Sequence, residues 1–379
     1  MARVQSVLVA HPSAECYGSD LQLLETVSAL VERGVGVTVV IPHEGPLIER
    51  LESRGAEVRV QSFPVLRRSA LRPAGLVRLV ADLVRRGPGI LRTVRSSDAG
   101  AVYVNTITIP WWLVAARLAR KRTLCHVHEA EETGPRLALR MLGMPTALAH
   151  RVIANSAASA RALSLSAPRA AAKTIVVHNG VPGPPSPPER PGRRQEDRFV
   201  VALVGRLSER KGTDVALEAI AILRGEGRNV ALALCGTAFE GYEWFERQLR
   251  ERAELPDLAG AVDFRGYVNP TWPTLADSDA VLVPSRVEPF GNTAVEAMLA
   301  ERPVIASRTQ GLAEIVEDGR TGLQVTPGDA QELAAALRTL ADDPERARQI
   351  AADGRADAER RFSVDAYART IHRVVTDQD

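Results

Sequence analysis

The sequence predicts an α/β protein made of two doubly wound parallel-sheet domains, and three observations support this prediction. Short β-branched runs alternate with amphipathic helical runs along the first half of the chain. A proline-rich stretch at 182–198 then interrupts the alternation, and the same pattern restarts after it. A chain of 379 residues, 45% of them hydrophobic, is long enough to bury two cores of this kind.

In the first half, short expected strands alternate with expected helices over much of the length. They are "SVLVA" at 6–10, "LQLLETVSALVERG" at 21–34, "VTVVIP" at 37–42, "LIERLESRGA" at 47–56, "VRVQS" at 58–62, "AVYVNT" at 101–106, "PWWLVAARLARK" at 110–121, "TLCHVHE" at 123–129, "RVIANS" at 151–156 and "TIVVHNG" at 174–180. Because ligands of open α/β sheets bind beyond the carboxyl ends of strands, the loop after each strand is a candidate for a site.

The second half repeats the alternation and ends in helices. Its expected elements are "FVVALVG" at 199–205, "TDVALEAIAILRGEG" at 213–227, "VALALCG" at 230–236, "AVDFRGYV" at 261–268, "AVLVPS" at 280–285, "RPVIAS" at 302–307 and a helical tail from about Ala330. We therefore expect an N-terminal domain at 1–181, a stiff linker at 182–198, a second domain at 199–362 and a final helix at 363–379.

Composition excludes several functions. The net charge of +2 gives no general attraction for nucleic acid. The three cysteines, Cys16, Cys125 and Cys235, have no metal-ligand spacing and suit a reducing compartment, so we expect no disulfide and no metal. No signal sequence and no apolar run of spanning length is present, which predicts a cytoplasmic protein or one peripheral to a membrane. The oligomeric state is left open.

The loop "EPFGNTAVE" at 288–296 holds two glutamates. Thr293 and Glu296 match a capping box at a helix start, which is a purely structural role. The backbone N–H groups of 291–293 would also form an anion site there, and Glu296 would accept hydrogen bonds from a ribose. Glu288 precedes a proline outside the helix, and its place beyond a strand end favours a function.

Two further loops carry candidate phosphate ligands. Arg206 and Lys211 follow the first strand of the second domain, where two cations suit a pyrophosphate, although a solvated basic loop would look the same. In the first domain, Gly18 and Ser19 precede a helix, and Gly18 allows a close backbone approach to phosphate. Ser19 and Gln22 also match a capping box.

His126 and His128 in "CHVHE" alternate at a strand end, so we expect them to face opposite sides of the sheet and not to share a metal. One would be buried or packed and the other would reach the ligand. The Asp277–Asp279 "DSD" lies ahead of a buried strand, the wrong end for a nucleotide site. With no GxGxxG and no GxxxxGK[ST] motif, nicotinamide and ATPase functions lack support.

The loop at 288–296 closely resembles the signature of retaining GT-B glycosyltransferases that use nucleotide sugars. Further segments resemble that family in its order: "VVHNGV" at 176–181, "VGRLSERKG" at 204–212, "FRGYV" at 264–268 and "GLAEIVEDGRTGLQVTPGD" at 311–329. The resemblance implies two Rossmann-like domains facing a cleft, with the donor on the second, the acceptor on the first, and a last helix crossing back to the first.

The resemblance also assigns roles. It implies a metal-independent front-face reaction in which the leaving diphosphate takes the acceptor proton and the α configuration is retained. His128 and Glu288 would act at the transferred hexose. The remaining residues would contact diphosphate (Arg206, Lys211, Gly18, Ser19, Gly291, Asn292, Thr293), ribose (Glu296), nucleobase (Tyr267, Val268) and donor sugar (the loop with Phe290). The family often has two adjacent glycines where this chain has Gly18 and Ser19.

The acceptor is left open among a glycan, a lipid-linked and a small-molecule substrate. Residues 67–95 carry eight arginines and one acidic residue among leucines and valines, which suits either an anionic membrane or a core-facing helix with a solvated arginine face broken at Pro88. Trp111 and Trp112 suit a core or an acceptor-site wall. Two alternative functions remain: a silent nucleotide-sugar binder, and a nucleotide-sugar epimerase, which would lack the paired glutamates.

Overall fold

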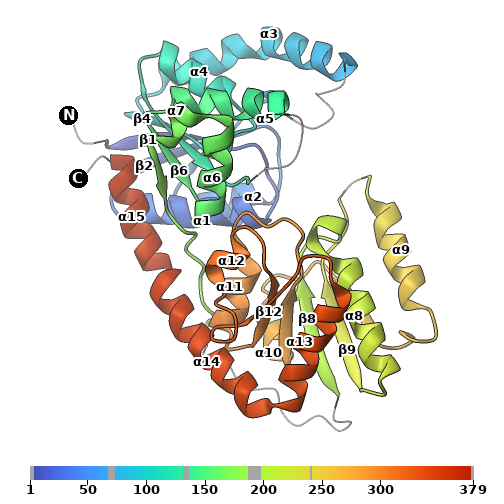
Figure 1. Cartoon of the computed structure of the whole chain (residues 1–379). Helices are drawn as coiled ribbons and strands as arrows, with labels where there is room; N and C mark the ends of the chain where they lie inside the picture. The colour runs from blue at the N-terminus through green and yellow to red at the C-terminus, as the bar shows by residue number, and fades with distance from the viewer. Residues whose placement is uncertain (1–3, 67–72, 131–135, 187–197, 240, 377–379) are drawn as a thin grey trace. The chain divides into compact units, whose positions relative to one another are not determined.

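The computed structural model describes residues 4–66, 73–130, 136–186, 198–239 and 241–376. The chain divides into two compact units, Met1–Gly180 with Val364–Asp379 (unit 1) and Val181–Ser363 (unit 2) (Figure 1). Most of the expected linker at 182–198 lies outside the described residues. Among the described residues, no helix has both the length and the apolar character needed to cross a membrane.

Unit 1 is a parallel sheet with helices around it. Its described strands form a seven-stranded sheet in the order β3-β2-β1-β4-β5-β6-β7. The elements are β1 (Ser6–Ala10), α1 (Gly18–Val31), β2 (Gly36–Ile41), α2 (Leu47–Ser53), β3 (Glu57–Val60), α3 (Pro73–Ser96), β4 (Ala101–Val104), α4 (Trp111–Leu118), β5 (Arg122–Val127), α5 (Arg136–Gly143), η2 (Met144–Leu148), β6 (Arg151–Ala154), α6 (Ala157–Ser166), α7 (Pro168–Ala171), β7 (Thr174–Val176) and α15 (Val364–Thr376).

Unit 2 has the same architecture. Its described strands form a six-stranded parallel sheet in the order β10-β9-β8-β11-β12-β13. The elements are β8 (Phe199–Val204), η3 (Glu209–Lys211), α8 (Thr213–Gly225), β9 (Val230–Cys235), α9 (Glu243–Ala253), β10 (Val262–Gly266), α10 (Trp272–Ala276), β11 (Ala280–Val283), α11 (Asn292–Leu299), β12 (Val304–Ser307), α12 (Leu312–Ile315), β13 (Leu323–Val325), α13 (Ala330–Asp342) and α14 (Pro344–Arg361).

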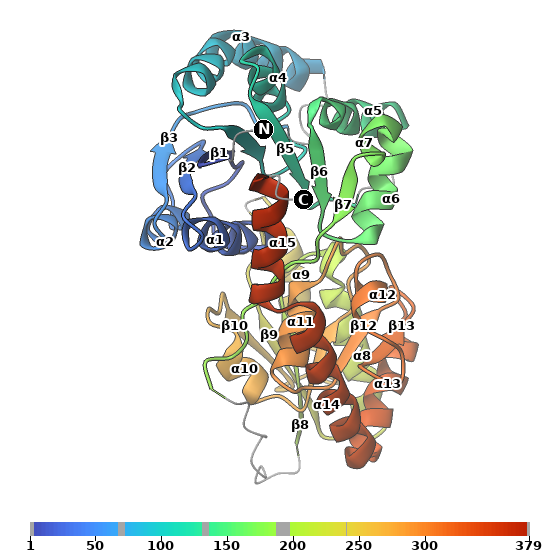
Figure 2. The ribbon, with the colours of Figure 1, turned by 90° about the vertical axis from the view of Figure 1, so that its left-hand side faces the viewer.

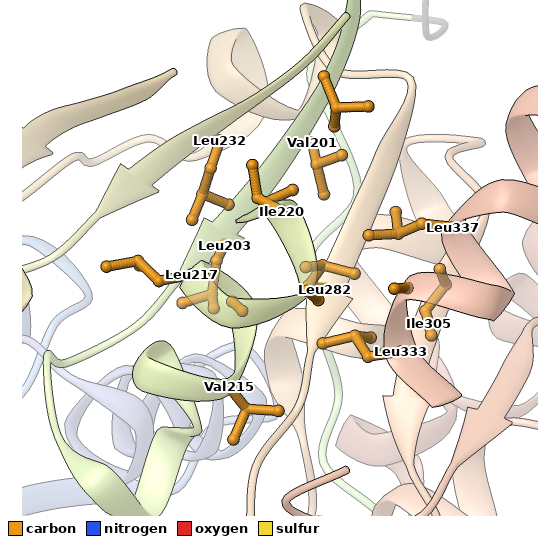
Figure 3. Close-up of a cluster of buried hydrophobic side chains, with 14 of the residues drawn as sticks. Val201, Leu203, Val215, Leu217, Ile220, Leu232, Leu282, Ile305, Leu333 and Leu337 are labelled. Carbon is orange, nitrogen blue, oxygen red and sulfur yellow. The ribbon is translucent and has the colours of Figure 1, made fainter. Parts of the chain in front are cut away.

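The apolar character of the central strands explains their place in the sheets. Helices cover both faces of a doubly wound sheet, so its inner strands are buried on both sides and need continuous apolar sequence. The runs "AVYV" of β4, "VALALC" of β9 and "AVLV" of β11 meet this need, and every residue in them is buried. Figure 3 shows one resulting core of unit 2, where Leu203 and Leu282 from the sheet pack with Leu217 of α8 and Leu333 of α13.

Helix α15 belongs to unit 1 although all of unit 2 precedes it in the sequence. It lies beside α1 (Figure 2), and Tyr367, Ile371 and Val375 on its inner face join the core formed by α1 and the sheet. The Tyr367 hydroxyl is 2.6 Å from the Thr26 hydroxyl of α1. Unit 1 therefore needs residues from both ends of the described chain.

Both sheets reverse their strand order at one point. In unit 1 the chain starts with β1 and returns with β4 on its other side; in unit 2, β8 and β11 have the same relation. We call these pairs the unit 1 and unit 2 switch points. The loops after the two strands of a switch point leave in opposite directions and open a crevice for ligands. Each unit therefore has one favoured place for a site.

Helix α3 contains the described part of the arginine-rich segment; residues 67–72 lie outside the described residues. The expected break at Pro88 is wrong, because the helix continues from Pro73 to Ser96. Gly87 directly precedes the proline, and it has no Cβ that the proline ring could crowd. Of the two tryptophans, Trp112 is a core residue against Phe63, with ring centroids 5.3 Å apart.

Candidate functional site

An ion pair spans the unit 2 switch point. Lys211 ends η3 in the loop after β8, and Glu288 lies in the loop after β11. The Lys211 ammonium donates to Glu288 Oε2 over 2.5 Å, and the Ser285 hydroxyl donates to the same oxygen over 3.2 Å. None of the described residues donates to Glu288 Oε1. The two residues thus give the crevice one ammonium and one carboxylate in direct contact.

The backbone of Glu288 is fixed as firmly as its carboxylate. Its N–H donates to the Gln310 side chain and its carbonyl accepts from Gly311 N, each over 3.0 Å. Only 7% of Glu288 is exposed. Burial raises the pKa of its carboxyl, but the charges of Lys211 and Arg210 with the hydrogen bonds outweigh it, so the pKa lies below its ordinary value. Glu288 is therefore ionised at neutral pH.

The loop that carries Lys211 packs directly on the end of β11. Gly212 has φ +69°, and a Cβ there would lie 2.1 Å from the carbonyl oxygen of Pro284. Beside this contact, the Arg286 guanidinium donates to both carboxylate oxygens of Asp214 over 2.8 and 2.7 Å. The glycine allows the close approach and the bidentate ion pair holds it, which keeps Lys211 next to Glu288.

Helix α11 places Glu296 near the same ion pair. The helix begins at Asn292 with Gly291 at its N-cap, so the expected capping box of Thr293 and Glu296 is wrong: Thr293 is the second residue of the helix, two positions beyond the N-cap. The Glu296 carboxylate instead accepts from the Thr271 hydroxyl over 3.2 Å. Burial raises the pKa of Glu296 to about 7, although Thr271 and the Lys211 charge oppose this rise.

The other unit 2 candidates differ in their surroundings. The Arg206 guanidinium stacks on the Phe239 ring, 3.8 Å from its centroid. Tyr267 is 46% exposed just beyond β10, and Val268 is partly buried beside it. The Phe290 ring is buried against Phe362, so its contribution to a sugar site is restricted to its main chain.

In unit 1, the two histidines of the "HVHE" segment lie together. His126 is fully buried and His128 is partly exposed, yet their ring centroids are only 4.0 Å apart. The expectation that they face opposite sides is therefore wrong. Strand β5 ends at Val127, so the alternation of side chains stops before His128 and its ring folds back over His126. Burial lowers the pKa of both imidazoles, that of His126 to about 3.

A chain of hydrogen bonds leads away from His128 across the unit 1 switch point. His128 Nε2 is 2.9 Å from Asn105 Oδ1, and Asn105 Nδ2 is 3.0 Å from His11 Nδ1. His11 Nε2 is in turn 2.8 Å from Asp20 Oδ1. His11 follows β1, Asn105 follows β4 and His128 follows β5, so the chain joins three strand ends to helix α1.

The predicted phosphate loop of unit 1 is the start of α1. Gly18 and Ser19 are the first two residues of this helix, and a Cβ on Gly18 would meet nothing within 4 Å. The expected capping box of Ser19 and Gln22 is wrong, because the Asp20 carboxylate accepts from the N–H of Tyr17 over 3.0 Å and takes the reciprocal position.

Sequence reasoning missed His11, Asp20 and Asn105. A usable signal was present, since His11 and Asn105 are each the first residue after a buried strand of the switch point. Among the described residues, no group of three or more His, Cys, Asp or Glu is arranged to hold a metal ion. The Asp279 carboxylate of the "DSD" segment lies at the amino end of β11 and accepts from Val200 N over 2.7 Å. Its role is therefore to join β11 to β8.

Two family models match this chain. The model described as "Glycosyl transferases group 1" matches residues 189–357, and that described as "Glycosyltransferase Family 4" matches residues 18–182. Together they account for most of the chain and correspond to the two sheets. The chain belongs to the group 1 glycosyltransferases with the GT-B fold.

Individual relatives agree with this placement. The D-inositol 3-phosphate glycosyltransferase of Kribbella flavida is 29% identical over 365 residues, covering 86% of this chain and 83% of that protein. The glycogen synthase of Mycobacterium tuberculosis is 36% identical over 150 residues, which are 39% of this chain but only 35% of the synthase. The Anabaena HepE structure in complex with UDP-glucose has a TM-score of 0.80 at 27% identity, covering 98% and 99% of the two chains.

Proposed function

We propose that this protein is a retaining glycosyltransferase that moves a hexose from a nucleotide diphosphate donor to an acceptor by a metal-independent front-face reaction. The observation that carries the proposal is the partly buried Lys211–Glu288 pair at the unit 2 switch point, with Glu296 close to it. Phosphates and sugar hydroxyls need opposite partners, a cation and a carboxylate, and this pair supplies both at adjacent positions.

The geometry of the pair leaves capacity for a ligand. An ammonium has three N–H donors. Among the described residues, the Lys211 ammonium donates to Glu288, which leaves two donors for phosphate oxygens. Glu288 Oε1 is available to accept from hydroxyls of the hexose. With Arg206, Lys211 would stabilise the charge that develops on the departing diphosphate, which is the largest catalytic contribution in this mechanism.

The N-terminus of α11 and its first turn complete the proposed donor site. The N–H groups of residues 291–293 would donate to phosphate or sugar oxygens. Glu296 would accept from the ribose hydroxyls, and the Tyr267–Val268 segment would lie beside the base. In unit 1, His128 would contact the hexose, and Gly18 and Ser19 the diphosphate. Since residues of both units are assigned to one reaction, substitutions in either unit should impair it.

The donor is identified by calorimetry and thermal shift with UDP, GDP, ADP, dTDP and their common sugars. We expect one diphosphate to stabilise the wild type selectively, and the stabilisation to be lost in the double variant Arg206→Ala, Lys211→Ala. Arg346→Ala, an exposed arginine of α14, controls for the loss of charge. No binding by any nucleotide would refute the donor site. Binding without transfer to any acceptor in a sugar, lipid and small-molecule panel would favour a silent binder.

The stereochemistry is tested separately. Once a donor and an acceptor are known, the ¹H NMR coupling constant of the first-formed product reports its anomeric configuration. Retention of the α configuration of an α-linked donor is expected. An inverted product would leave glycosyl transfer intact but exclude the front-face mechanism.

We further propose that the protein is cytoplasmic and that α3 contacts an anionic membrane surface, where a lipid-linked acceptor would be presented. Arg78, Arg85 and Arg92 recur every seven residues and are all exposed, so they form one row along the helix. Val77, Val80 and Val84, which are 70%, 52% and 73% exposed, form a separate stripe on the helix because they recur every three or four residues. A helix that exposes a cationic row and an apolar stripe suits an anionic bilayer. Because a second copy of this chain would carry the same positive charge, α3 is a poor contact between two copies.

Vesicle co-sedimentation tests this contact. We expect binding to vesicles containing phosphatidylglycerol and not to pure phosphatidylcholine, with loss of binding in Arg85→Glu with Arg92→Glu and in Val80→Ser with Val84→Ser. Leu165→Ser on α6, 72% exposed in the wild type, is the matched control. Equal binding of all variants would exclude α3 as the contact.

A further inference from the structure

The hydrogen-bond chain of unit 1 connects a buried carboxylate to the histidine of the proposed reaction. Its members are Asp20, His11, Asn105 and His128, and its three contacts measure 2.8, 3.0 and 2.9 Å. His11 is 0% exposed and Asn105 1% exposed, while His128 retains some exposure. Because the inner members have no water to exchange with, the direction of each hydrogen bond decides the direction of the next.

The Asp20 end sets this direction. A carboxylate only accepts, so His11 must carry a proton on Nε2. The Asn105 amide nitrogen lies 3.0 Å from His11 Nδ1 and can only donate, so Nδ1 accepts. The Asn105 oxygen lies 2.9 Å from His128 Nε2, which must therefore carry its proton there. The reversed amide would require a second proton on His11, at Nδ1.

The other nitrogen of His128 is consequently an acceptor. Burial, with His126 and His11 nearby, keeps the pKa of His128 well below its ordinary value, so the ring carries one proton at neutral pH. Among the described residues, the His128 ring makes its hydrogen bond through Nε2, to Asn105. With that proton committed to Asn105, Nδ1 presents a lone pair.

We infer that Asp20, His11 and Asn105 are positioning residues that hold His128 in the Nε2–H tautomer, so that its Nδ1 accepts a hydrogen bond from a substrate hydroxyl. The use of Nδ1 rests on the proposed function; the tautomer itself does not. With the wrong tautomer, Nδ1–H would donate toward the same hydroxyl, which would have to rotate and lose its preferred partner.

The decisive test is the tautomer of His128 in the substrate-free protein. Selective ¹⁵N-histidine labelling gives signals from seven histidines, and His128→Gln assigns the one of interest. Long-range ¹H–¹⁵N spectra distinguish protonated from unprotonated ring nitrogens. We expect Nε2–H at His128; a proton on Nδ1 in the wild type would overturn the inference.

Substitutions then test the coupling along the chain. In Asp20→Asn, the new amide can donate to His11, which allows every bond of the chain to reverse, so we expect the Nδ1–H form of His128 to appear. Ser13→Ala removes a contact of 3.5 Å to the other oxygen of Asp20 and should leave the tautomer unchanged. An unchanged His128 spectrum in Asp20→Asn would contradict the coupling. Asn105→Leu, which removes both central bonds, is the second variant.

Activity provides the functional arm. With UDP-glucose as the first probe donor, or the donor found by the nucleotide panel, Asp20→Asn and Asn105→Leu should lower kcat/KM about 10-fold, the effect of one hydrogen bond. Asn105→Asp keeps an acceptor for His128 Nε2–H, while a proton on His11 Nδ1 or on the new carboxyl fills the other contact. It should restore tautomer and rate relative to Asn105→Leu. A protein that binds no nucleotide would refute the proposed function yet leave the tautomer result standing.

Discussion

The two switch points share one topology and differ in their electrostatics. In unit 2, the loops after β8 and β11 bring an ammonium and a carboxylate into contact. In unit 1, the loops after β1 and β4 bring together an imidazole and an amide, and the Asp20 carboxylate contacts the imidazole at the far end. Strand order thus determines where a site forms, while the first residues after each strand determine its chemistry.

The two switch points are also held differently. In unit 2 the backbones themselves touch, with Gly212 against Pro284, and an external ion pair secures them. In unit 1 side chains bridge the gap between strand ends, with His11 and Asn105 in the middle. Where two backbones touch, even one added methyl group must push them apart. Where side chains bridge the gap, a substitution removes one hydrogen bond and leaves the backbone in place. Substitutions should therefore have larger effects in unit 2.

The largest effect is expected for Gly212→Ala. Its φ of +69° and the 2.1 Å distance from a Cβ to Pro284 O leave no room for a methyl group. We expect a loss of about 3 kcal/mol or more in the free energy of unfolding, measured by urea denaturation. Gly225→Ala, where a Cβ meets nothing within 4 Å, is the control and should be close to neutral. An equal effect of the two would show that the backbone contact is unimportant.

Lys211→Ala should rank second. It leaves the buried Glu288 carboxylate without its cation, a change that costs about 3–5 kcal/mol for fully buried pairs. Because the Lys211 side chain is 23% exposed, we expect about 2 kcal/mol. Adding Glu288→Gln removes the unpaired charge and should recover most of the stability. If the double variant were as unstable as the sum of both single variants, the pair would not be coupled.

Asp20→Asn provides the matching measurement in unit 1. The amide can accept from Tyr17 N–H and donate to His11, so both contacts persist without the charge of the carboxylate. Replacing charge-assisted by neutral hydrogen bonds predicts a loss of about 1 kcal/mol in the free energy of unfolding. A loss greater than that of Lys211→Ala would reverse the order of the two switch points and refute the comparison.

The effect of Glu296→Gln depends on pH and is smallest in acid. The pKa of Glu296 is raised from 4.5 to about 7 in the folded protein, so the folded state binds the proton more tightly than the unfolded state. Its contribution to stability is complete below about pH 4.5 and is lost as the pH rises through about 7. Relative to the wild type, Glu296→Gln should therefore gain stability as the pH rises across this range, by up to about 3 kcal/mol for the full shift, as thermal melts in matched buffers would show. A pH-independent difference would exclude the raised pKa.

Patterns of strands and helices were readable from the sequence because buried parallel strands need continuous apolar runs. The alternation predicted both sheets, and the loop at 288–296 indicated Glu288 correctly as a residue outside the helix. Helix starts were less predictable. Thr293 and Ser19 both fit capping boxes by residue type, but the N-caps of α11 and α1 lie two residues earlier. Asp20 also takes the reciprocal position that was expected for Gln22.

The unit 1 hydrogen-bond chain was not predictable from local sequence. Its members are 9 residues apart between His11 and Asp20 but 94 apart between His11 and Asn105. No periodicity or short motif connects positions so distant, and only the strand order brings them together. His128 illustrates the same limit. Strand β5 ends at Val127, one residue before His128, and the His128 ring therefore lies over His126 and does not face away from it.

The position of α15 has a consequence for the order of folding during synthesis on the ribosome. Residues 1–180 leave the ribosome first, but the apolar side of α1 that receives Tyr367, Ile371 and Val375 stays uncovered until residues 364–376 follow. Unit 2, whose residues 181–363 are continuous, can finish its core earlier. The unit translated first is thus completed second, and a truncation before α15 would expose an apolar surface on the N-terminal half of the chain.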